Sequence, residues 1–395
     1  MKRYKIDEFI TDFFQKNMFQ ICIGALLLFS VLMRIYLAPQ TISGDYNVTL
    51  LSWINEYKSL SFWGGLERTI GNYYVPYNIF LDIVARIPGE PWLWIAITSC
   101  AAEYIGAYYL YKLLMLAAGS NDSKTQKQAV IVSVSMLFLP VAIMNGALWK
   151  QCDAIYTAFI LAGLYYYFSD RTRRALILLA IGFTFKLQII FIIPFYIIMY
   201  FVKKNYSVVQ FVWIPVMYVV AGIPCVMAQR GIRETYSVYL RQNSGYNEMT
   251  WLSNSLYRLG FTSYDVFGIP AIILAISIFA FALLYVFEHR DNVTNKKALM
   301  LAGWSILTCY LFLPAMHERY DYAGVIIMTA VTIMFNRKMI PAVIAINLCS
   351  MLVYNYYLFD FDIIDGVPFV VMSVVYLAAY FALSIDIINK LKCSE

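Results

Sequence analysis

Residues 17–48 read "NMFQICIGALLLFSVLMRIYLAPQTISGDYNV". The part from Met18 to Ala38 is apolar and long enough for a helix that crosses a bilayer, which needs about 20 residues. Charged residues precede it, and no small-residue cleavage site of the kind that ends a signal peptide follows it. The stretch therefore predicts a membrane protein that keeps its first helix, with Asp45 directly beyond that helix.

The composition of the whole chain agrees with this interpretation. Of the 395 residues, 61% are hydrophobic and only 14% are charged, and the mean hydropathy is +0.65. Soluble domains are nearer to half apolar and a quarter charged. The seven cysteines show neither paired nor metal-binding spacing, so they predict no disulfide framework. We expect an all-α, polytopic membrane protein.

Apolar windows along the chain predict about twelve transmembrane helices. They lie near residues 18–38, 92–116, 129–144, 154–169, 174–185, 188–202, 208–227, 269–287, 298–315, 322–335, 339–357 and 367–389. Most Lys and Arg residues fall between alternate windows, and the positive-inside rule then places both termini in the cytoplasm. Residues 1–17 have apolar side chains at helical spacing, which predicts a short helix along the cytoplasmic surface.

The loops expected on the outer side are longer than those on the inner side. They include two long segments, residues 39–91 and 229–268, and the shorter residues 145–153, 317–322 and 359–366. The links expected on the inner side are short and basic. Because binding and catalytic residues concentrate on loops held by a rigid scaffold, we expect the functional site on the outer side.

Asp45 and Tyr46 begin the first outer loop, within "TISGDYNVTL" (41–50). Turns with glycine often hold an aspartate, so one interpretation of Asp45 is a turn residue. The other is a general base held at the membrane surface. Beyond it, "TLLSWINEY" (49–57) predicts an amphipathic helix, and the loop's Trp and Tyr rings could form an interfacial aromatic belt or stack on sugars.

Polar side chains interrupt two of the apolar stretches. Four residues cluster in "NGALWKQCDAIY" (145–156), namely Trp149, Lys150, Gln151 and Asp153. Such clustering indicates the wall of a polar cavity. Lys186 and Gln188 lie in "FTFKLQIIFIIP" (183–194), where burial is unfavourable unless they face water or a partner. Lys186 could alternatively extend its ammonium group to the membrane surface.

The stretch "FLPAMHERYDYAG" (312–324) holds one of the chain's two histidines. Three ionisable residues are adjacent there, at the end of an apolar run: His317, Glu318 and Arg319. A helix-end anchor would explain Arg319 alone, whereas the group of three favours a binding site. The second long outer loop adds a polar and aromatic segment, residues 239–260, which includes Asn254.

Several common enzyme motifs are missing from the sequence. It has no Walker loop, no dinucleotide fingerprint, no H-E-x-x-H zinc motif and no G-x-S-x-G elbow. In their order, however, the stretches above resemble motifs of the GT-C superfamily of membrane glycosyltransferases, which use polyprenyl-phosphate sugars as donors. "GDYNV" resembles the acidic site of the first outer loop, "GALWKQCDAIY" the W-x-Q-x-D stretch, "GFTFKLQIIFIIP" the K-x-Q stretch, and "MHERYDYAG" the H-E-R-Y motif.

A fifth stretch, "YNEMTWLSNSLYRLG", is a weaker match to a loop with an Asn-x-Leu-Tyr-like end. The ordered set covers most of the chain. It is most similar to bacterial relatives of the GPI-anchor mannosyltransferases and of the glucosyltransferases of N-glycan assembly. The resemblance implies a GT-C-like fold with a common membrane module at residues 1–227, including the outer loop 39–91. A variable module at 228–395, including the outer loop 229–268, would follow.

The resemblance also implies an activity and a set of roles. The enzyme would be an inverting hexosyltransferase that moves a hexose from a polyprenyl-phosphate donor to an acceptor hydroxyl on the outer membrane face, in cell-surface glycan or glycolipid assembly. Asp45 would be the catalytic base. Three residues would bind the donor phosphate: Arg319, His317 and Lys186. The others would bind or orient substrate: Asp153, Gln151, Lys150, Glu318, Gln188, Tyr46 and Asn254.

The expected partners follow from this reaction. They are the lipid-linked donor, a glycan, glycolipid or polymer acceptor, and membrane lipids, but no nucleic acid, in what we expect to be a bacterial plasma membrane. We expect no cofactor and assign no metal ligand. Many members of the superfamily have two adjacent acids and often use a metal, so the single Asp45 leaves metal dependence open.

Two other functions remain open at the level of sequence. A transporter or flippase of lipid-linked sugars would also have about twelve spans, but such proteins often show inverted repeats, which are not visible here. An O-antigen-type polymerase usually concentrates arginines in large outer loops. The second long outer loop does contain four of them: Arg230, Arg233, Arg241 and Arg258.

Overall fold

The computed structural model describes residues 4–244, 247–359 and 366–393, and within these residues it is almost entirely helical. The α-helices are α1 (Lys5–Leu37), α2 (Leu51–Lys58), α3 (Phe62–Glu67), α4 (Val75–Val84), α5 (Pro91–Ala118), α6 (Ser123–Met136), α7 (Pro140–Ile143), α8 (Asp153–Phe168), α9 (Thr172–Phe185), α10 (Ile193–Lys203), α11 (Trp213–Met227), α12 (Ile232–Tyr236), α13 (Val238–Ser244), α14 (Tyr264–Glu288), α15 (Asn295–Phe312), α16 (Tyr322–Phe335), α17 (Ile340–Phe359) and α18 (Val367–Lys392).

Short 3₁₀ and π turns connect or extend these helices. They are η1 (Ala38–Gln40), η2 (Asp45–Leu50), η3 (Met144–Leu148), η4 (Leu187–Ile192), η5 (Val208–Val212), η6 (Leu256–Leu259), η7 (Arg290–Asn292) and η8 (Arg337–Met339). Two strands of two residues each, β1 (Thr250–Trp251) and β2 (Met316–His317), pair in parallel with Trp251 opposite His317. This pair brings the second long loop next to the segment that contains Arg319.

Local sequence explains where the helices begin and end. Pro91 begins α5, where its fixed φ suits the first helical position and its missing N–H is not needed. Gly119 ends the same helix with a φ of 66°, a left-handed conformation that glycine adopts without a Cβ penalty. Asp122 then caps α6, because its carboxylate accepts hydrogen bonds from the backbone N–H groups of Lys124 and Thr125.

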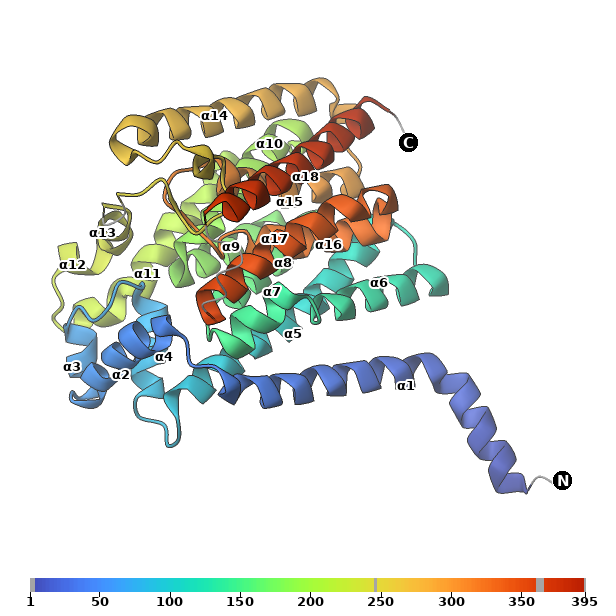
Figure 1. Ribbon diagram of the computed structural model, residues 1–395, viewed down its shortest axis with the longest axis horizontal. Coiled ribbons are helices and arrows are strands. Elements are labelled where there is room, and N and C mark those ends of the chain that lie inside the picture. Colours follow the sequence, from blue (N-terminus) through green and yellow to red (C-terminus); the bar gives the residue numbers. More distant parts are fainter. Residues whose placement is uncertain (1–3, 245–246, 360–365, 394–395) are drawn as a thin grey trace.

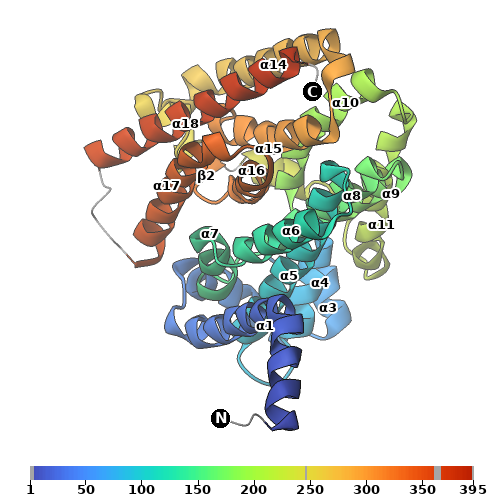
Figure 2. The same ribbon diagram turned by 90° about the vertical axis from the view of Figure 1, so that its right-hand side faces the viewer.

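The helices form a bundle with a buried centre and exposed flanks. The main packing partners are α5 with α8, α8 with α9, α15 with α16, and α17 with α18. α1 and α14 lie on opposite flanks of this bundle in both views (Figures 1 and 2). Only Ser30 and Arg34 of α1 are buried, so most of this long apolar helix is left to face lipid.

Five helical stretches of the described chain are long and apolar enough to cross a membrane. They are Lys5–Gln40, Val208–Met227, Tyr264–Glu288, Arg337–Phe359 and Val367–Lys392. A sixth results if Ser123–Met136 and Pro140–Leu148, which meet at a bend of 50°, are one broken span. The finding indicates a multi-pass membrane protein, but it gives far fewer spans than the twelve or so expected from the apolar windows.

The difference arises because apolar windows also occur in helices that are short and buried by protein. α8, α9 and α16 have 16, 14 and 14 residues, less than the length of about 20 that a span needs. Burial within a protein core selects the same apolar residues as lipid does. Hydropathy alone therefore does not separate the two environments. The predicted boundary between residues 227 and 228 stays a prediction.

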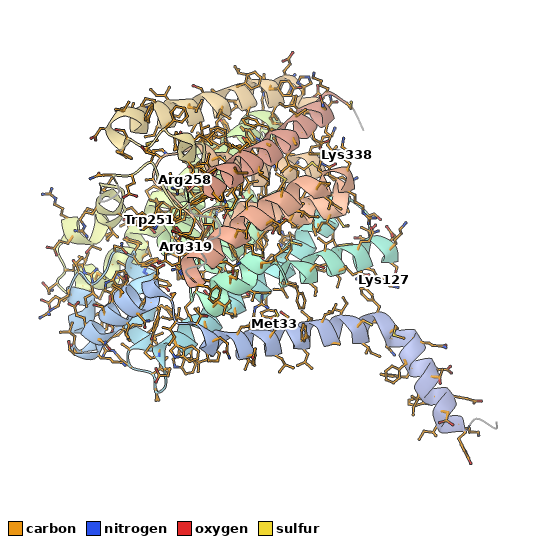
Figure 3. The ribbon with its side chains drawn as sticks, viewed as in Figure 1. Met33, Lys127, Trp251, Arg258, Arg319 and Lys338 are labelled. Atoms are coloured by element: carbon orange, nitrogen blue, oxygen red, sulfur yellow. The ribbon has the colours of Figure 1, made fainter. Side chains whose placement is uncertain are left out.

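The predicted outer loops gather at one end of the bundle. α2, α3, α4, α12 and α13 lie together there, on the left of Figure 1, while α1 and α18 have their free ends on the right. Arg319 and Trp251 lie toward the loop-rich end, and Lys127 and Lys338 lie at the other end (Figure 3). Residues 5–17 of the predicted surface helix are the first part of α1, which bends away from the bundle (Figure 1), and residues 1–3 lie outside the described residues. The predicted outer loop at 359–366 is almost wholly outside the described residues.

Candidate functional site

A polar cavity of about 260 Å³ lies at the loop-rich end of the bundle. Segments from distant parts of the chain form its wall: η2 and α2, the link before α8, the residue after α9, and the loops at β1 and β2. Its lining residues are Asp45, Thr49, Leu50, Trp53, Asn72, Tyr73, Gln151, Lys186, Gln242, Trp251, His317, Glu318, Arg319, Tyr320 and Tyr357. Six of the eleven predicted site residues are among them.

Asp45 is held by three hydrogen-bond donors. Its Oδ2 accepts from Trp149 Nε1 at 3.0 Å and from Gln151 Nε2 at 2.7 Å. Its Oδ1 accepts from Tyr357 Oη at 2.6 Å. The side chain is 30% exposed, so the carboxylate is fixed in orientation while one side remains open to the cavity.

Asp153 and Lys186 form a buried ion pair at the base of the cavity. Lys186 Nζ lies 2.5 Å from Asp153 Oδ1, and Asn145 Nδ2 donates to Asp153 Oδ2 at 3.0 Å. Asp153 is wholly buried at the start of α8, and Lys186 follows the last residue of α9. Because each charge has a partner, the expected cost of placing Lys186 in apolar sequence is offset. Lys186 still lines the cavity, so the surface explanation is wrong for this residue.

Arg319 is surrounded by three carboxylates. Its Nη1 lies 2.5 Å from Glu318 Oε1 and 3.7 Å from Asp45 Oδ2, and its Nε lies 3.6 Å from Asp153 Oδ2. The guanidinium also lies over the Trp149 ring, 5.4 Å from its centroid. Burial works against the charge of Arg319, but the three acids raise its pKa above the ordinary value. Arg319 thus stays a cation in a site that excludes much of the solvent.

His317 and Glu318 lie beside Arg319 in the wall of the cavity. His317 Nδ1 lies 3.7 Å from Glu318 Oε2, and both residues line the cavity. Burial would raise the pKa of Glu318, but the neighbouring Arg319 guanidinium and His317 bring it below its ordinary value. Glu318 is therefore an anion that holds Arg319 and His317 in place. This agrees with the predicted orienting role of Glu318.

The structure places five predicted site residues outside the lining of the polar cavity: Asp153, which pairs with Lys186, and four others. Lys150 Nζ instead donates to the carbonyl oxygens of Ala38, Thr41 and Leu148. These hydrogen bonds fix the chain between α1 and Asp45, which is an indirect role rather than contact with a ligand in the cavity. Burial lowers the pKa of Lys150 to about 8. Tyr46 is buried in a hydrophobic cluster formed mainly by residues 46–95.

Gln188 and Asn254 are the other two. Gln188 is buried and lines a neighbouring cavity. Asn254 is fully buried, its backbone N–H donates to Tyr310 Oη at 2.9 Å, and neither its amide nitrogen nor its amide oxygen has a hydrogen-bond partner in the described part of the chain. Neither residue therefore borders the space between Asp45 and Arg319.

Reasoning from sequence missed two residues that donate hydrogen bonds to the carboxylates of the site. Tyr357, near the end of α17, contacts Asp45 across 312 positions. Asn145 supports Asp153 from the same short segment as Gln151. The signal for Asn145 was its place at the start of "NGALWKQCD"; Tyr357 is one of 33 tyrosines, and only the run "YNYY" at the end of a span sets it apart.

An apolar groove of about 170 Å³ adjoins the polar cavity. It shares Gln242 and Tyr320 with that cavity. Its other lining residues are Leu187, Gln188, Ile190, Phe191, Tyr264, Ile272, Leu313, Pro314, Ala315 and Met316. The two spaces together offer a charged compartment beside an apolar one, which suits an amphiphile with an anionic head.

The four arginines of the second long loop do not gather at this site. Arg230 donates to backbone carbonyls of residues 65, 67 and 68, Arg241 donates to Glu234 O, and Arg258 lies over the Phe369 ring. None of the four lines the polar cavity as far as the described residues define it. They therefore lend no support to the polymerase alternative.

Within the described residues, no three His, Cys, Asp or Glu side chains are arranged to hold a metal ion. No protein-family model matches the chain, and no curated protein matches it either. Function is therefore inferred from the geometry of the site itself.

Proposed function

We propose that the protein is a GT-C-type membrane glycosyltransferase. It would take a hexose from a polyprenyl-phosphate donor and transfer it, with inversion at the anomeric carbon, to an acceptor hydroxyl. The site would face the outer side of a bacterial plasma membrane, with both chain termini in the cytoplasm. The product would belong to cell-surface glycan or glycolipid assembly.

One observation carries this proposal: a single open carboxylate, Asp45, lies 3.7 Å from the arginine of a basic group at the mouth of one cavity. A glycosyl transfer from a lipid phosphate needs a base on the acceptor side and donors on the phosphate side. It needs no second carboxylic acid, because the phosphate already leaves readily. Asp45 on one side and Arg319, His317 and Lys186 on the other fit that division.

The proposed chemical step is a single displacement. The acceptor oxygen attacks the anomeric carbon while its proton passes to Asp45. The bond between that carbon and the phosphate oxygen breaks, and its electron pair leaves with the lipid phosphate. Negative charge grows on the phosphate, where Arg319 offers N–H donors in a fixed fork and Lys186 a point charge.

The apolar groove supports a lipid donor. A soluble sugar nucleotide would have no use for an apolar space beside its phosphate, whereas the first isoprene units of a lipid phosphate would fill it. Since the groove and the cavity share Gln242 and Tyr320, the head and the tail of one molecule could occupy both.

The test uses purified protein in detergent with a synthetic short-chain polyprenyl-phosphate hexose. Release of hexose to water can be measured without knowing the acceptor, since water can replace the acceptor hydroxyl. Asp45→Asn should lower release by about 10²–10⁴-fold, the usual contribution of a general base. The matched control is Asp265→Asn, an exposed aspartate at the start of α14 that does not line the cavity.

Wild-type protein that moves intact donor between leaflets of a vesicle without releasing hexose would be a flippase. Retention of near wild-type release by Asp45→Asn would refute Asp45 as the base.

A further inference from the structure

The two oxygens of Asp45 are in different environments. Oδ2 accepts from Trp149 and Gln151 and is also the oxygen nearest Arg319, at 3.7 Å. Oδ1 has one donor among the described residues, Tyr357. A carboxylate oxygen offers about two lone-pair positions. Oδ2 is therefore fully engaged, and the remaining capacity of the carboxylate is on Oδ1.

Tyr357 is held in a defined position by its own packing. Its ring stacks on Trp149 with centroids 4.4 Å apart and planes 19° apart. Tyr354, one turn earlier on α17, contacts the same indole edge-on at 5.1 Å. Trp149 is fully buried and donates to the other oxygen of Asp45. Trp149 and Tyr357 thus each donate a hydrogen bond to the Asp45 carboxylate, Trp149 to Oδ2 and Tyr357 to Oδ1.

We propose that Oδ1 of Asp45 is the atom that takes the acceptor's proton, and that Tyr357 is the positioning residue that aims it; this rests on the proposed function. The hydroxyl of Tyr357 occupies one lone pair of Oδ1 and leaves the other for the proton. The proton moves from the acceptor oxygen to Oδ1 as that oxygen bonds to the anomeric carbon. Tyr357 neither gains nor loses a proton in this step.

A residue that aims the base affects the chemical step and not the binding of the donor. Removal of its hydroxyl should therefore lower kcat per folded molecule and leave the donor KM unchanged. A residue with only a structural role would lower the amount of active protein instead.

The test is Tyr357→Phe, which keeps the ring against Trp149 and removes only the hydroxyl. Hexose release from the synthetic polyprenyl-phosphate hexose is followed as a function of donor concentration, per folded molecule. We expect kcat to fall about tenfold and the donor KM to stay unchanged. Tyr356→Phe, the preceding tyrosine on α17, does not line the cavity and should match wild type.

A double variant removes the remaining ambiguity. If Tyr357 acts through Asp45, then Tyr357→Phe should cause little further loss of hexose release in an Asp45→Asn background. An unchanged kcat in Tyr357→Phe, or a full tenfold loss in the Asp45→Asn background, would overturn the role of Tyr357. Wild-type protein that releases no hexose would instead overturn the proposed function itself, before any variant is compared.

Discussion

Two groups of charged residues in the described part of the protein differ in how they are paired. The first, the membrane pair, consists of Arg34 of α1 and Glu103 of α5, with Nε and Oε2 2.7 Å apart. The second, the cavity cluster, consists of Asp45, Asp153, Lys186, Glu318 and Arg319. Both groups place ionisable side chains inside a largely apolar bundle.

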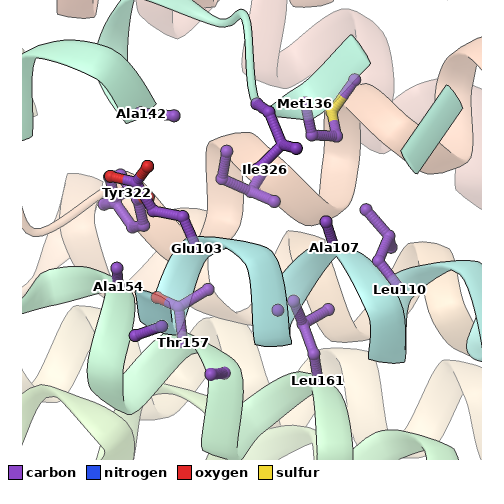
Figure 4. Close-up of a pocket in the computed structure, with 14 residues that line it drawn as sticks. Glu103, Ala107, Leu110, Met136, Ala142, Ala154, Thr157, Leu161, Tyr322 and Ile326 are labelled. Carbon is purple, nitrogen blue, oxygen red and sulfur yellow. The ribbon is translucent and has the colours of Figure 1, made fainter. Parts of the chain in front are cut away.

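In the membrane pair the donors of Arg34 are largely occupied, whereas Glu103 Oε1 has no hydrogen-bond partner among the described residues. Arg34 also donates to Ser30 Oγ at 2.6 Å and to Leu137 O at 2.7 Å, which uses most of its N–H groups. The cavity beside Glu103 measures only about 20 Å³ and is otherwise lined mainly by apolar residues (Figure 4). A ligand therefore has no room beside the pair. The contact between Arg34 and Glu103 instead attaches α1 to the bundle.

The cavity cluster is open instead. Arg319 lies 3.6–3.7 Å from two of its carboxylates, longer than a normal hydrogen bond, and the cluster borders a space of about 260 Å³. The contrast teaches that burial and pairing alone do not identify a functional charge. Incomplete pairing beside a cavity that is large enough for a ligand distinguishes a site that can still bind one.

The largest expected effect is on Arg319. Arg319→Ala should reduce hexose release from the donor by about 10²–10³-fold, the usual cost of losing one donor to a charge that develops in the transition state. Arg319→Lys should recover only part of this, because the ammonium lacks the guanidinium's fork. Arg290→Lys, at an exposed site at the end of α14, is the control. Equal activity of Arg319→Ala and wild type would remove the distinction between the two groups of charges.

A smaller effect is expected at the membrane pair, and on stability instead of chemistry. Arg34→Met leaves Glu103 buried without its partner and should lower the free energy of unfolding by about 3–5 kcal/mol. The double variant Arg34→Met, Glu103→Leu should regain much of that loss, since no uncompensated charge remains. Unfolding in mixed detergent micelles measures both. Hexose release per folded molecule should stay near that of wild type; a selective loss of turnover would show that this pair serves the reaction.

A third effect, the pH dependence of stability, concerns Asp321, which lies behind the cavity cluster and accepts hydrogen bonds from Ser350 and Tyr376. Burial raises the pKa of Asp321 to about 7, although both hydroxyl donors oppose this. The unfolded chain releases this proton near pH 4. Between about pH 4 and 7 the folded state therefore binds more protons, and its stability should fall as the pH rises, by at most about 1.4 kcal/mol per unit.

Asp321→Asn should remove this pH dependence, because the amide does not titrate. The measurement is the unfolding midpoint in micelles at several pH values between 4 and 8. Asp122→Asn, at an exposed helix cap, does not share the burial of Asp321 and serves as the comparison. Identical pH slopes for Asp321→Asn and wild type would show that another group titrates.

Much of the candidate site could be predicted because its residues are conspicuous in the sequence. Lys186 interrupts an apolar run, and His317, Glu318 and Arg319 are adjacent at the end of another. The structure brings them into one cavity with Asp45. Because burying a charge is costly, each charged residue in an apolar stretch can be recognised from the sequence alone, without knowledge of its partners.

Lys150 and Tyr357 show where this reasoning failed. Lys150 looked like a cavity residue because Gln151 follows it, yet its positive φ of 61° accompanies a side chain that meets backbone carbonyls. Tyr357 looked like any other interfacial tyrosine. Which way a side chain turns depends on local backbone geometry and on neighbours that are distant in the chain.

The sequence by itself determined that this is an apolar, helical membrane protein and which of its polar residues stand out, because hydrophobicity and charge belong to single residues and short windows. Only the tertiary structure showed which apolar windows form helices that are long and apolar enough to cross a membrane, and which form short helices buried by protein. It also decided which oxygen of Asp45 remains open. Those outcomes depend on contacts such as that between Asp45 and Tyr357, and packing of the whole chain sets them.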